Sequence, residues 1–248
     1  MAKMQYIWAE PEEIEGTEGL QFAPGVSRDD SLKTFQPDLT RVVDLEYDED
    51  TEIYDIDLLR YRLSDETLSI NPNYYMNTQG LVNLAPIEKY QGINIRVSRP
   101  HLLGCDYRVQ TGVEGMRPNC DLHDTYIDVE PITGIVMNAN KRIQINVELW
   151  QTEFFLTNIS NLVMPILWYE QGGLIPEDLA DMFKDLIYGA LELKENVPLA
   201  CIGIGAAICL PGVLVASVQA VKRQKVEKIG HAKKEKPQKN KMLNFMDF

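Results

Sequence analysis

The sequence predicts an α+β fold that is mainly antiparallel β, followed by one C-terminal transmembrane helix. Three observations lead to this prediction. Several short segments alternate apolar and polar residues, most clearly "KRIQINVELW" at 141–150, which is the pattern of a half-buried strand. Clusters of Asn, Pro and Gly separate these segments. Residues 197–221 contain no charged side chain, and a basic cluster follows them directly.

The first part of the chain predicts a leader and then a hairpin. Residues 1–18 are acidic and show no apolar period, so we expect a loose leader. The segments 40–47 and 52–63 predict two strands, because apolar side chains alternate with two arginines in the second segment. An acidic turn at 48–50 is expected to join them.

Three later segments predict strands, and one predicts a helix. Residues 93–98 alternate in polarity, and 141–150 alternate throughout their length. The segment 162–170 predicts a further strand that ends at the Gly172–Gly173 pair. A helix is expected to begin at Pro176, because apolar residues recur at helical spacing after it.

The uncharged segment 197–221 predicts a membrane span. A helix rises about 1.5 Å per residue, so this segment exceeds the ~30 Å hydrocarbon core of a bilayer. A buried core helix is the alternative, but such a helix rarely runs this long without a charge. The basic end of a span normally faces the cytoplasm. We therefore expect residues 222–248 to form a basic cytoplasmic tail and residues 19–196 to form an outer or luminal domain.

The first residues do not fit this orientation by themselves. Residues 1–16 contain no apolar run that could act as a signal peptide or as a first span. We therefore expect either the inverted topology or a natural N-terminus that is longer than the sequence.

The charge distribution argues against nucleic-acid binding by the main body. The chain carries 24 basic and 37 acidic residues, a net charge of −13. From Lys222 onward there are nine basic and three acidic residues, a net charge of +6, which leaves −19 for residues 1–221. Such an acidic body repels a phosphate backbone.

The sequence contains no familiar catalytic motif. Patterns of the G-x-S-x-G, H-E-x-x-H and Walker types are missing outside the span, so we expect no enzyme activity and no cofactor. His101 lies four residues before Cys105, and Cys120 lies three residues before His123. These spacings suit a tetrahedral zinc site, but they also allow a disulfide or two free thiols. The four residues alone leave the three interpretations open.

The segment 113–147, "VEGMRPNCDLHDTYIDVEPITGIVMNANKRIQINV", resembles the class B scavenger receptor family. Its Pro-Asn, His, aspartate-bearing strand, Pro-Ile-Thr-Gly and amphipathic strand follow in that family's order. "RPHLLG" at 99–104 is similar to the family's Pro-His-Phe stretch, with Leu102 in place of Phe. The resemblance covers roughly residues 19–221.

The resemblance implies part of a β-barrel-like ectodomain with flanking helices and a hydrophobic tunnel, between two spans. The chain corresponds to about the second half of that ectodomain. It implies a membrane receptor that binds fatty acids, sterols or lipoproteins and conducts them to the bilayer. A lysosomal sorting or adhesion receptor for a luminal protein is the alternative, and self-association is compatible with both. Location at the plasma membrane or in endosomes and lysosomes is left open.

The resemblance also bears on individual residues. His101 and His123 match family histidines, whereas Cys105 and Cys120 do not match family cysteines, so no metal site is expected. On the oxidising side of a membrane a Cys105–Cys120 disulfide is favoured over free thiols. Asn158 begins the sequon before the span and is the expected glycosylation site. One face of the strand 141–150 could line the tunnel, with ordinary core packing as the alternative: Ile143, Ile145, Val147 and Leu149.

Overall fold

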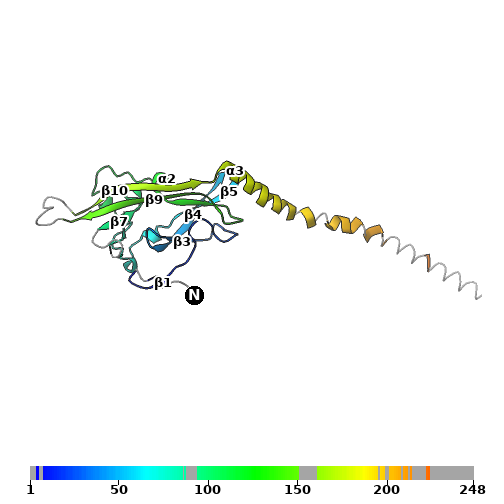
Figure 1. Ribbon diagram of the computed structural model, residues 1–248, viewed down its shortest axis with the longest axis horizontal. Coiled ribbons are helices and arrows are strands. Elements are labelled where there is room, and N and C mark those ends of the chain that lie inside the picture. The colour runs from blue at the N-terminus through cyan, green and yellow to red at the C-terminus, as the bar shows by residue number, and fades with distance from the viewer. Residues whose placement is uncertain are drawn as a thin grey trace, which may run out of the picture. The chain divides into compact units, whose positions relative to one another are not determined.

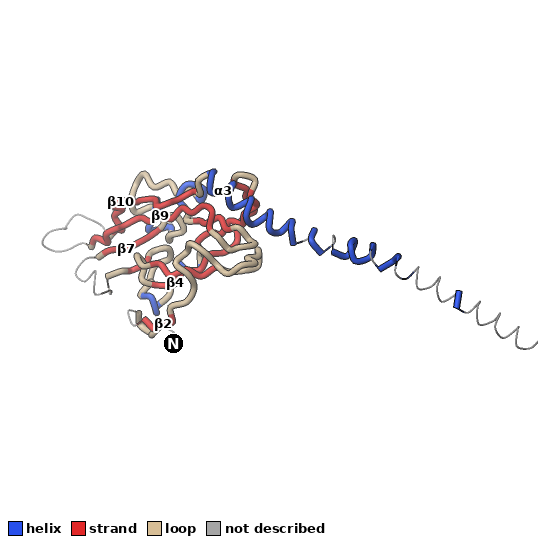
Figure 2. The backbone as a smooth tube through the Cα atoms, turned by 45° about the vertical axis from the view of Figure 1, so that its right-hand side comes forward, coloured by secondary structure: helices blue, strands red, loops and turns tan. Residues whose placement is uncertain are grey.

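The computed structural model of the chain describes residues 4–5, 8–85, 87, 94–150, 161–194, 196–198, 201–207, 209–211, 213 and 222–223. The chain forms two compact units, Met1–Asp181 and Met182–Phe248, and each is described by itself. Strands are the main regular secondary structure of the first unit, with loops between them, and the described residues of the second are helical (Figure 2).

An eight-stranded antiparallel sheet forms the first unit (Figure 1). The strands run in the order β3-β4-β5-β8-β9-β7-β6, and β10 also pairs with β9. One edge of β9 is shared by β8 and β7, while β10 follows the whole of the other edge from Asn138 to Leu149. The strands are β3 Leu32–Gln36, β4 Arg41–Ile53, β5 Ile56–Leu63, β6 Val82–Asn83, β7 Ile95–Ser98, β8 Tyr126–Val129, β9 Val136–Leu149 and β10 Leu162–Leu174.

Short helical turns and a small ribbon accompany the sheet. The ribbon consists of β1 Met4–Gln5 and β2 Glu12–Glu13. The helical turns are η1 Glu66–Leu68, η2 Pro72–Tyr74, η4 Pro100–Leu102, α1 Tyr107–Gln110 and α2 Cys120–His123.

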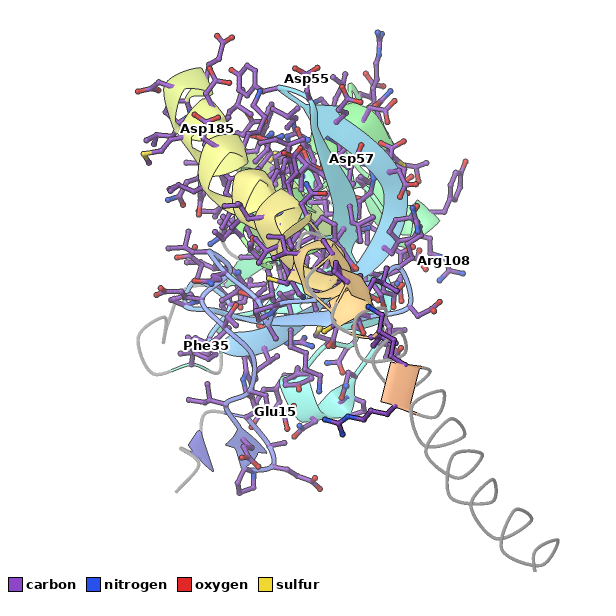
Figure 3. The ribbon with its side chains drawn as sticks, turned by 90° about the vertical axis from the view of Figure 1, so that its right-hand side faces the viewer. Glu15, Phe35, Asp55, Asp57, Arg108 and Asp185 are labelled. Carbon is purple, nitrogen blue, oxygen red and sulfur yellow. The ribbon has the colours of Figure 1, made fainter. Side chains whose placement is uncertain are left out.

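The β4–β5 hairpin confirms both predicted strands but corrects the position of their turn. β4 runs through the acidic residues 48–50, and the chain turns at Tyr54 and Asp55, whose φ angles are 51° and 60°. Two such residues make a tight hairpin turn whose twist matches that of the strands. Figure 3 labels Asp55 at its tip. The acidic residues stay in the strand because β5 supplies partners, such as Arg60 Nη1 at 3.1 Å from Glu49 Oε1.

The other predicted strands are confirmed with shifted ends. β9 and β10 run side by side (Figure 1), and β10 continues to Leu174, beyond the expected end at Gly172–Gly173. Gly172 permits this close pairing, because a Cβ there would lie 2.1 Å from Asn140 Oδ1. β7 covers most of the strand expected at 93–98, of which Ile93 lies outside the described residues.

The barrel closure implied by the family resemblance is not found. Within the described residues, the end strands β3 and β6 do not pair with each other, so the sheet is open. Its ends nevertheless share one core, in which Val43 of β4 packs with Val82 of β6 and Val97 of β7. Because β4 and β6 are far apart in the strand order, the sheet must curve strongly to bring them together.

The described part of the leader is attached to the sheet at Trp8. This side chain is 4% exposed and belongs to the same core as Val43. Its Nε1 donates a hydrogen bond to Thr40 O at 3.1 Å, and its ring meets Tyr74 edge-on at 5.3 Å. A buried indole with a satisfied N–H stabilises packing around it.

The helix predicted after Pro176 is confirmed. It begins as α3, Glu177–Phe183, and passes through a π-helical turn, η5 Lys184–Tyr188. Phe183 and Tyr188 meet edge-on with their ring centroids 5.8 Å apart.

One helix in the described part of the chain, Glu177–Pro211, is long and apolar enough to cross a membrane by length and composition. Many of its large apolar side chains are exposed, including Ile202, Ile204 and Leu210, as expected for a helix that faces lipid. The predicted span 197–221 begins within this helix, and residues 214–221 lie outside the described residues.

Candidate functional site: an apolar pocket in the curved sheet

A pocket of about 440 Å³ lies in the first unit, on one face of the curved sheet. Strands from β3 to β10 contribute to its walls, which are mostly apolar. The volume lies in the range of pockets that hold small molecules. Its main apolar lining residues are Leu39, Val43, Leu45, Leu63, Val82, Val97, Ile127, Val136, Ala139 and Ile143.

The predicted tunnel-lining face meets this pocket at one residue. Ile143 lines the pocket and is 8% exposed, and it also belongs to the core. Ile145, Val147 and Leu149 lie farther along β9, are half-buried, and are not among the residues that line the pocket. Ile143 therefore both lines the pocket and packs in the core, so it is compatible with both interpretations of this face.

Most of the wall was not predicted from the sequence. Val43, Leu63 and Val97 come from three separate strands, and the local alternation of each strand indicates only that these side chains share a buried face. Their convergence depends on the curvature of the sheet, for which a single strand carries no signal.

Three basic side chains and one acidic side chain also line the pocket. The basic ones are Arg99, Lys141 and Arg142, and the acidic one is Glu18. Lys141 Nζ lies 2.5 Å from Asp38 Oδ2, a carboxylate that does not itself line the pocket. The charged side chains of the lining are therefore mainly basic, and each basic one is paired with a carboxylate beside the pocket.

Arg142 and Arg99 are held by further carboxylates. Arg142 Nε lies 2.5 Å from Glu170 Oε2 of β10, and Arg99 Nε lies 3.0 Å from Asp124 Oδ1. Burial raises the pKa of Asp124, although Arg99 acts in the opposite direction. These contacts fix both guanidinium groups beside the pocket.

The middle of the polar face of β9 is buried, although its residue types predict a solvent-facing surface. Gln144 is 2% exposed and Asn146 is fully buried. Gln144 Nε2 donates to Asn146 Oδ1 at 2.8 Å, and Asn146 Nδ2 donates to Ser98 Oγ at 3.0 Å. Gln144 Oε1 accepts from the backbone N–H of His101 at 2.8 Å. The turn at η4 therefore covers this face and supplies hydrogen-bond partners to it.

The two histidines of the paired motif come together. The rings of His101 and His123 stack with centroids 4.3 Å apart and planes inclined by 18°. His101 Nδ1 accepts the backbone N–H of Arg117 at 3.2 Å, and His123 Nδ1 accepts that of Asn119 at 3.0 Å. Burial, followed by the charges of His101 and Arg142, lowers the pKa of His123.

The cysteines do not complete a metal site with these histidines. Among the described residues, no group of three or more His, Cys, Asp or Glu side chains is placed to hold a metal ion. Cys105 is buried, its Sγ lies 3.4 Å from Gly80 O, and burial raises its pKa to about 12. Cys120 is exposed, and both thiols are free. The disulfide between them has no support in this geometry and stays a prediction.

The glycosylation site cannot be placed. Asn158 belongs to residues 151–160, which lie outside the described residues, so its glycan also stays a prediction.

Together, the curved antiparallel sheet with an apolar pocket and the apolar helix define a β domain linked to a candidate membrane span. A model of the CD36 family matches residues 2–216, and the chain belongs to this family. This confirms the resemblance to class B scavenger receptors drawn from residues 113–147.

Several curated proteins are similar to the chain. It is 28% identical to lysosome membrane protein 2 of Rattus norvegicus over 202 residues, covering 77% of the chain and 42% of that protein. It is 29% identical to sensory neuron membrane protein 1 of Apis mellifera over 218 residues, covering 82% and 42%. It is 28% identical to sensory neuron membrane protein 2 of Anopheles gambiae over 229 residues, covering 85% and 39%. The chain thus matches about two fifths of each relative.

Proposed function

We propose that the chain is part of a membrane receptor that binds an amphipathic lipid, with a fatty acid as the simplest ligand. The apolar pocket, with Lys141 in a partly exposed ion pair at its edge, is the observation that carries this proposal. An acyl chain would lie against the apolar walls, and its carboxylate would lie near Lys141. Transfer of such a ligand to the bilayer is part of the same proposal.

The two ends of the ligand gain free energy from different parts of the pocket. Each methylene group that leaves water contributes about 0.8 kcal/mol, so a long acyl chain is favoured in an apolar pocket. Lys141 is paired with Asp38 at the protein surface, where an ion pair is worth only about 0–1 kcal/mol. A ligand carboxylate can therefore replace Asp38 at little cost.

The arrangement relative to the membrane belongs to the proposal. Lysosome membrane protein 2 and the sensory neuron membrane proteins are membrane proteins by name, and this chain carries a helix able to span a bilayer. We place residues 19–196 on the outer or luminal side, 197–221 in the membrane, and 222–248 in the cytoplasm. The plasma membrane and the endosomal or lysosomal membrane both suit this arrangement.

The proposal is tested by binding a fluorescent fatty acid to the full chain in a neutral detergent. Ala139 faces the pocket beside Ile127 on the neighbouring strand, so Ala139→Phe should fill the pocket and weaken binding at least tenfold. Leu122→Phe is the matched control, because Leu122 is 62% exposed and does not line the pocket.

Equal binding by both variants and the unaltered chain would refute the pocket as the lipid site. If the folded chain binds no fatty acid, sterol or lipoprotein at all, the alternative of a receptor for a protein ligand is favoured.

A further inference from the structure

A second pocket, of about 320 Å³, lies in the first unit and differs in chemistry from the first. Two arginines line it, Arg96 from β7 and Arg108 from α1, together with Glu148 from β9. We call this cavity the polar pocket. Amide and hydroxyl side chains complete the polar part of its lining: Tyr75, Asn77, Thr78, Asn83 and Asn161.

Glu148 holds the guanidinium group of Arg96 in place, but one of its nitrogens has no hydrogen-bond partner among the described residues. Its Nε donates to Glu148 Oε2 at 2.8 Å, and its Nη2 contacts the same oxygen. Its Nη1 is buried and, among the described residues, has no hydrogen-bond partner. A buried guanidinium N–H without an acceptor is unfavourable, so an acceptor beside Arg96 would stabilise the folded protein.

Arg108 adds a charge that no carboxylate of the described residues offsets. Its side chain is exposed, and Figure 3 shows it at the surface. No ion pair to Arg108 is found in the described part of the chain. Since Glu148 neutralises Arg96, the polar pocket carries a net charge of +1 from Arg108.

We propose that the polar pocket binds a tetrahedral oxyanion, phosphate or sulfate, carried by a small hydroxylated molecule such as a sugar. Guanidinium groups bind phosphate and sulfate oxygens through charge-assisted hydrogen bonds, which are stronger than neutral ones. A lone anion would leave most of the volume unfilled. The amide and hydroxyl groups, including Asn77 and Thr78, suit the hydroxyl groups of an attached sugar.

The polar pocket is separate from the proposed lipid site. Asn83 and Arg96 line the polar pocket, whereas Val82 and Val97, their neighbours on the same strands, line the apolar pocket. Because successive strand residues point to opposite faces, the sheet itself lies between the two sites. Oxyanion binding can therefore succeed or fail independently of lipid binding.

Isothermal titration calorimetry of the full chain in a neutral sugar detergent tests the proposal. Sodium phosphate, sodium sulfate, glucose 6-phosphate and glucose are titrated at one ionic strength against a chloride reference. We expect saturable binding of phosphate and sulfate, tighter binding of glucose 6-phosphate, and no binding of glucose.

Two variants locate the site. Arg108→Gln should weaken glucose 6-phosphate binding roughly tenfold, the cost of one charge-assisted hydrogen bond. Arg28→Gln is the matched control, since it removes the same charge from an exposed arginine that pairs with Asp50 outside the pocket. The double variant Arg96→Gln, Glu148→Gln keeps both positions polar, removes both charges so that no carboxylate is left unpaired, and should abolish saturable binding.

The proposal is overturned if the folded chain gives no saturable heat with phosphate, sulfate or glucose 6-phosphate. It is also overturned if Arg108→Gln binds as tightly as Arg28→Gln. Should the double variant fail to fold, as judged by circular dichroism, the comparison of the two exposed arginines still decides the question.

Discussion

The stacked pair of His101 and His123 should make the folded domain less stable in mild acid. Each ring accepts a backbone N–H through Nδ1, so protonation at that nitrogen breaks a hydrogen bond. Two charged rings at a centroid distance of 4.3 Å would repel each other. At about 4 Å the repulsion is roughly 1 kcal/mol in water and roughly 4 kcal/mol near a protein surface.

The sign of the effect follows from the lowered pKa of His123. In the unfolded chain a histidine titrates near 6.5, above its value in the folded protein. The unfolded state therefore gains a proton first as the pH falls. The stabilisation is fully present above about pH 6.5 and is lost as the pH falls toward the folded pKa. Charged groups near the pair include Arg142, which strengthens the shift, and Asp124, whose pKa is raised.

Urea unfolding at pH 7.5 and pH 5.0, at constant ionic strength, measures the loss. We expect the unaltered chain to lose roughly 1–2 kcal/mol between these values, because a ring kept neutral in the folded state costs at most about 1.4 kcal/mol per pH unit below 6.5. In His123→Asn the amide oxygen can take the place of Nδ1 toward Asn119, and no charge can form. This variant should therefore lose much less stability between the two pH values.

His231→Asn is the matched control, because it removes a histidine from the basic tail and should keep the full loss. The raised pKa of Asp124 acts in the opposite direction, but it is common to all three proteins and cancels in the comparison. An equal loss of stability in His123→Asn and in the unaltered chain would refute the reasoning.

Three further predictions concern the thiols, the glycan and two glycines. Alkylation of the folded chain without reductant should modify Cys120 and spare Cys105 until denaturation; protection of both until reduction would establish the disulfide instead. When the chain is expressed with a supplied leader, glycosidase should increase its gel mobility through loss of a glycan at Asn158, and no shift would favour the inverted topology. Gly134→Ala should lower the melting temperature more than Gly25→Ala: both positions have positive φ, but only a Cβ at Gly134 would meet a backbone oxygen, at 2.4 Å, and equal shifts would contradict this.

The strands were predictable where local pattern decides the structure. β9 carries a two-residue alternation along most of its length, β10 carries an apolar run that leads into two glycines, and the span carries an uncharged run. The β4–β5 turn was placed wrongly because acidic residues at 48–50 are typical of turns. In the folded chain Arg60 pairs with Glu49 across the hairpin, and this long-range contact outweighs the local preference.

The surroundings of the candidate sites could not be predicted, because they depend on contacts between residues that are far apart in the sequence. Gln144 and Asn146 are polar and predict a solvent-facing surface. In the folded chain, Ser98 and the turn at His101 bury them in a hydrogen-bond network. The convergence of His101 with His123 was suggested by their motif spacing, but the spacing indicates neither the stacking of the rings nor the positive φ of His101, 53°. Tertiary packing decides each of these features.

The alternation of β6 and β7 connects the two pockets physically. Val82 pairs with Val97 on one face of the sheet, and Asn83 pairs with Arg96 on the other. A one-residue slip of this pairing would exchange the faces, so that arginine entered the apolar pocket and valine entered the polar one. Burying an unpaired charge costs far more than the two-residue pairing contributes. The polarity of the two pockets therefore holds the register of this short strand pair. The register in turn keeps the apolar and polar linings on opposite faces of the sheet.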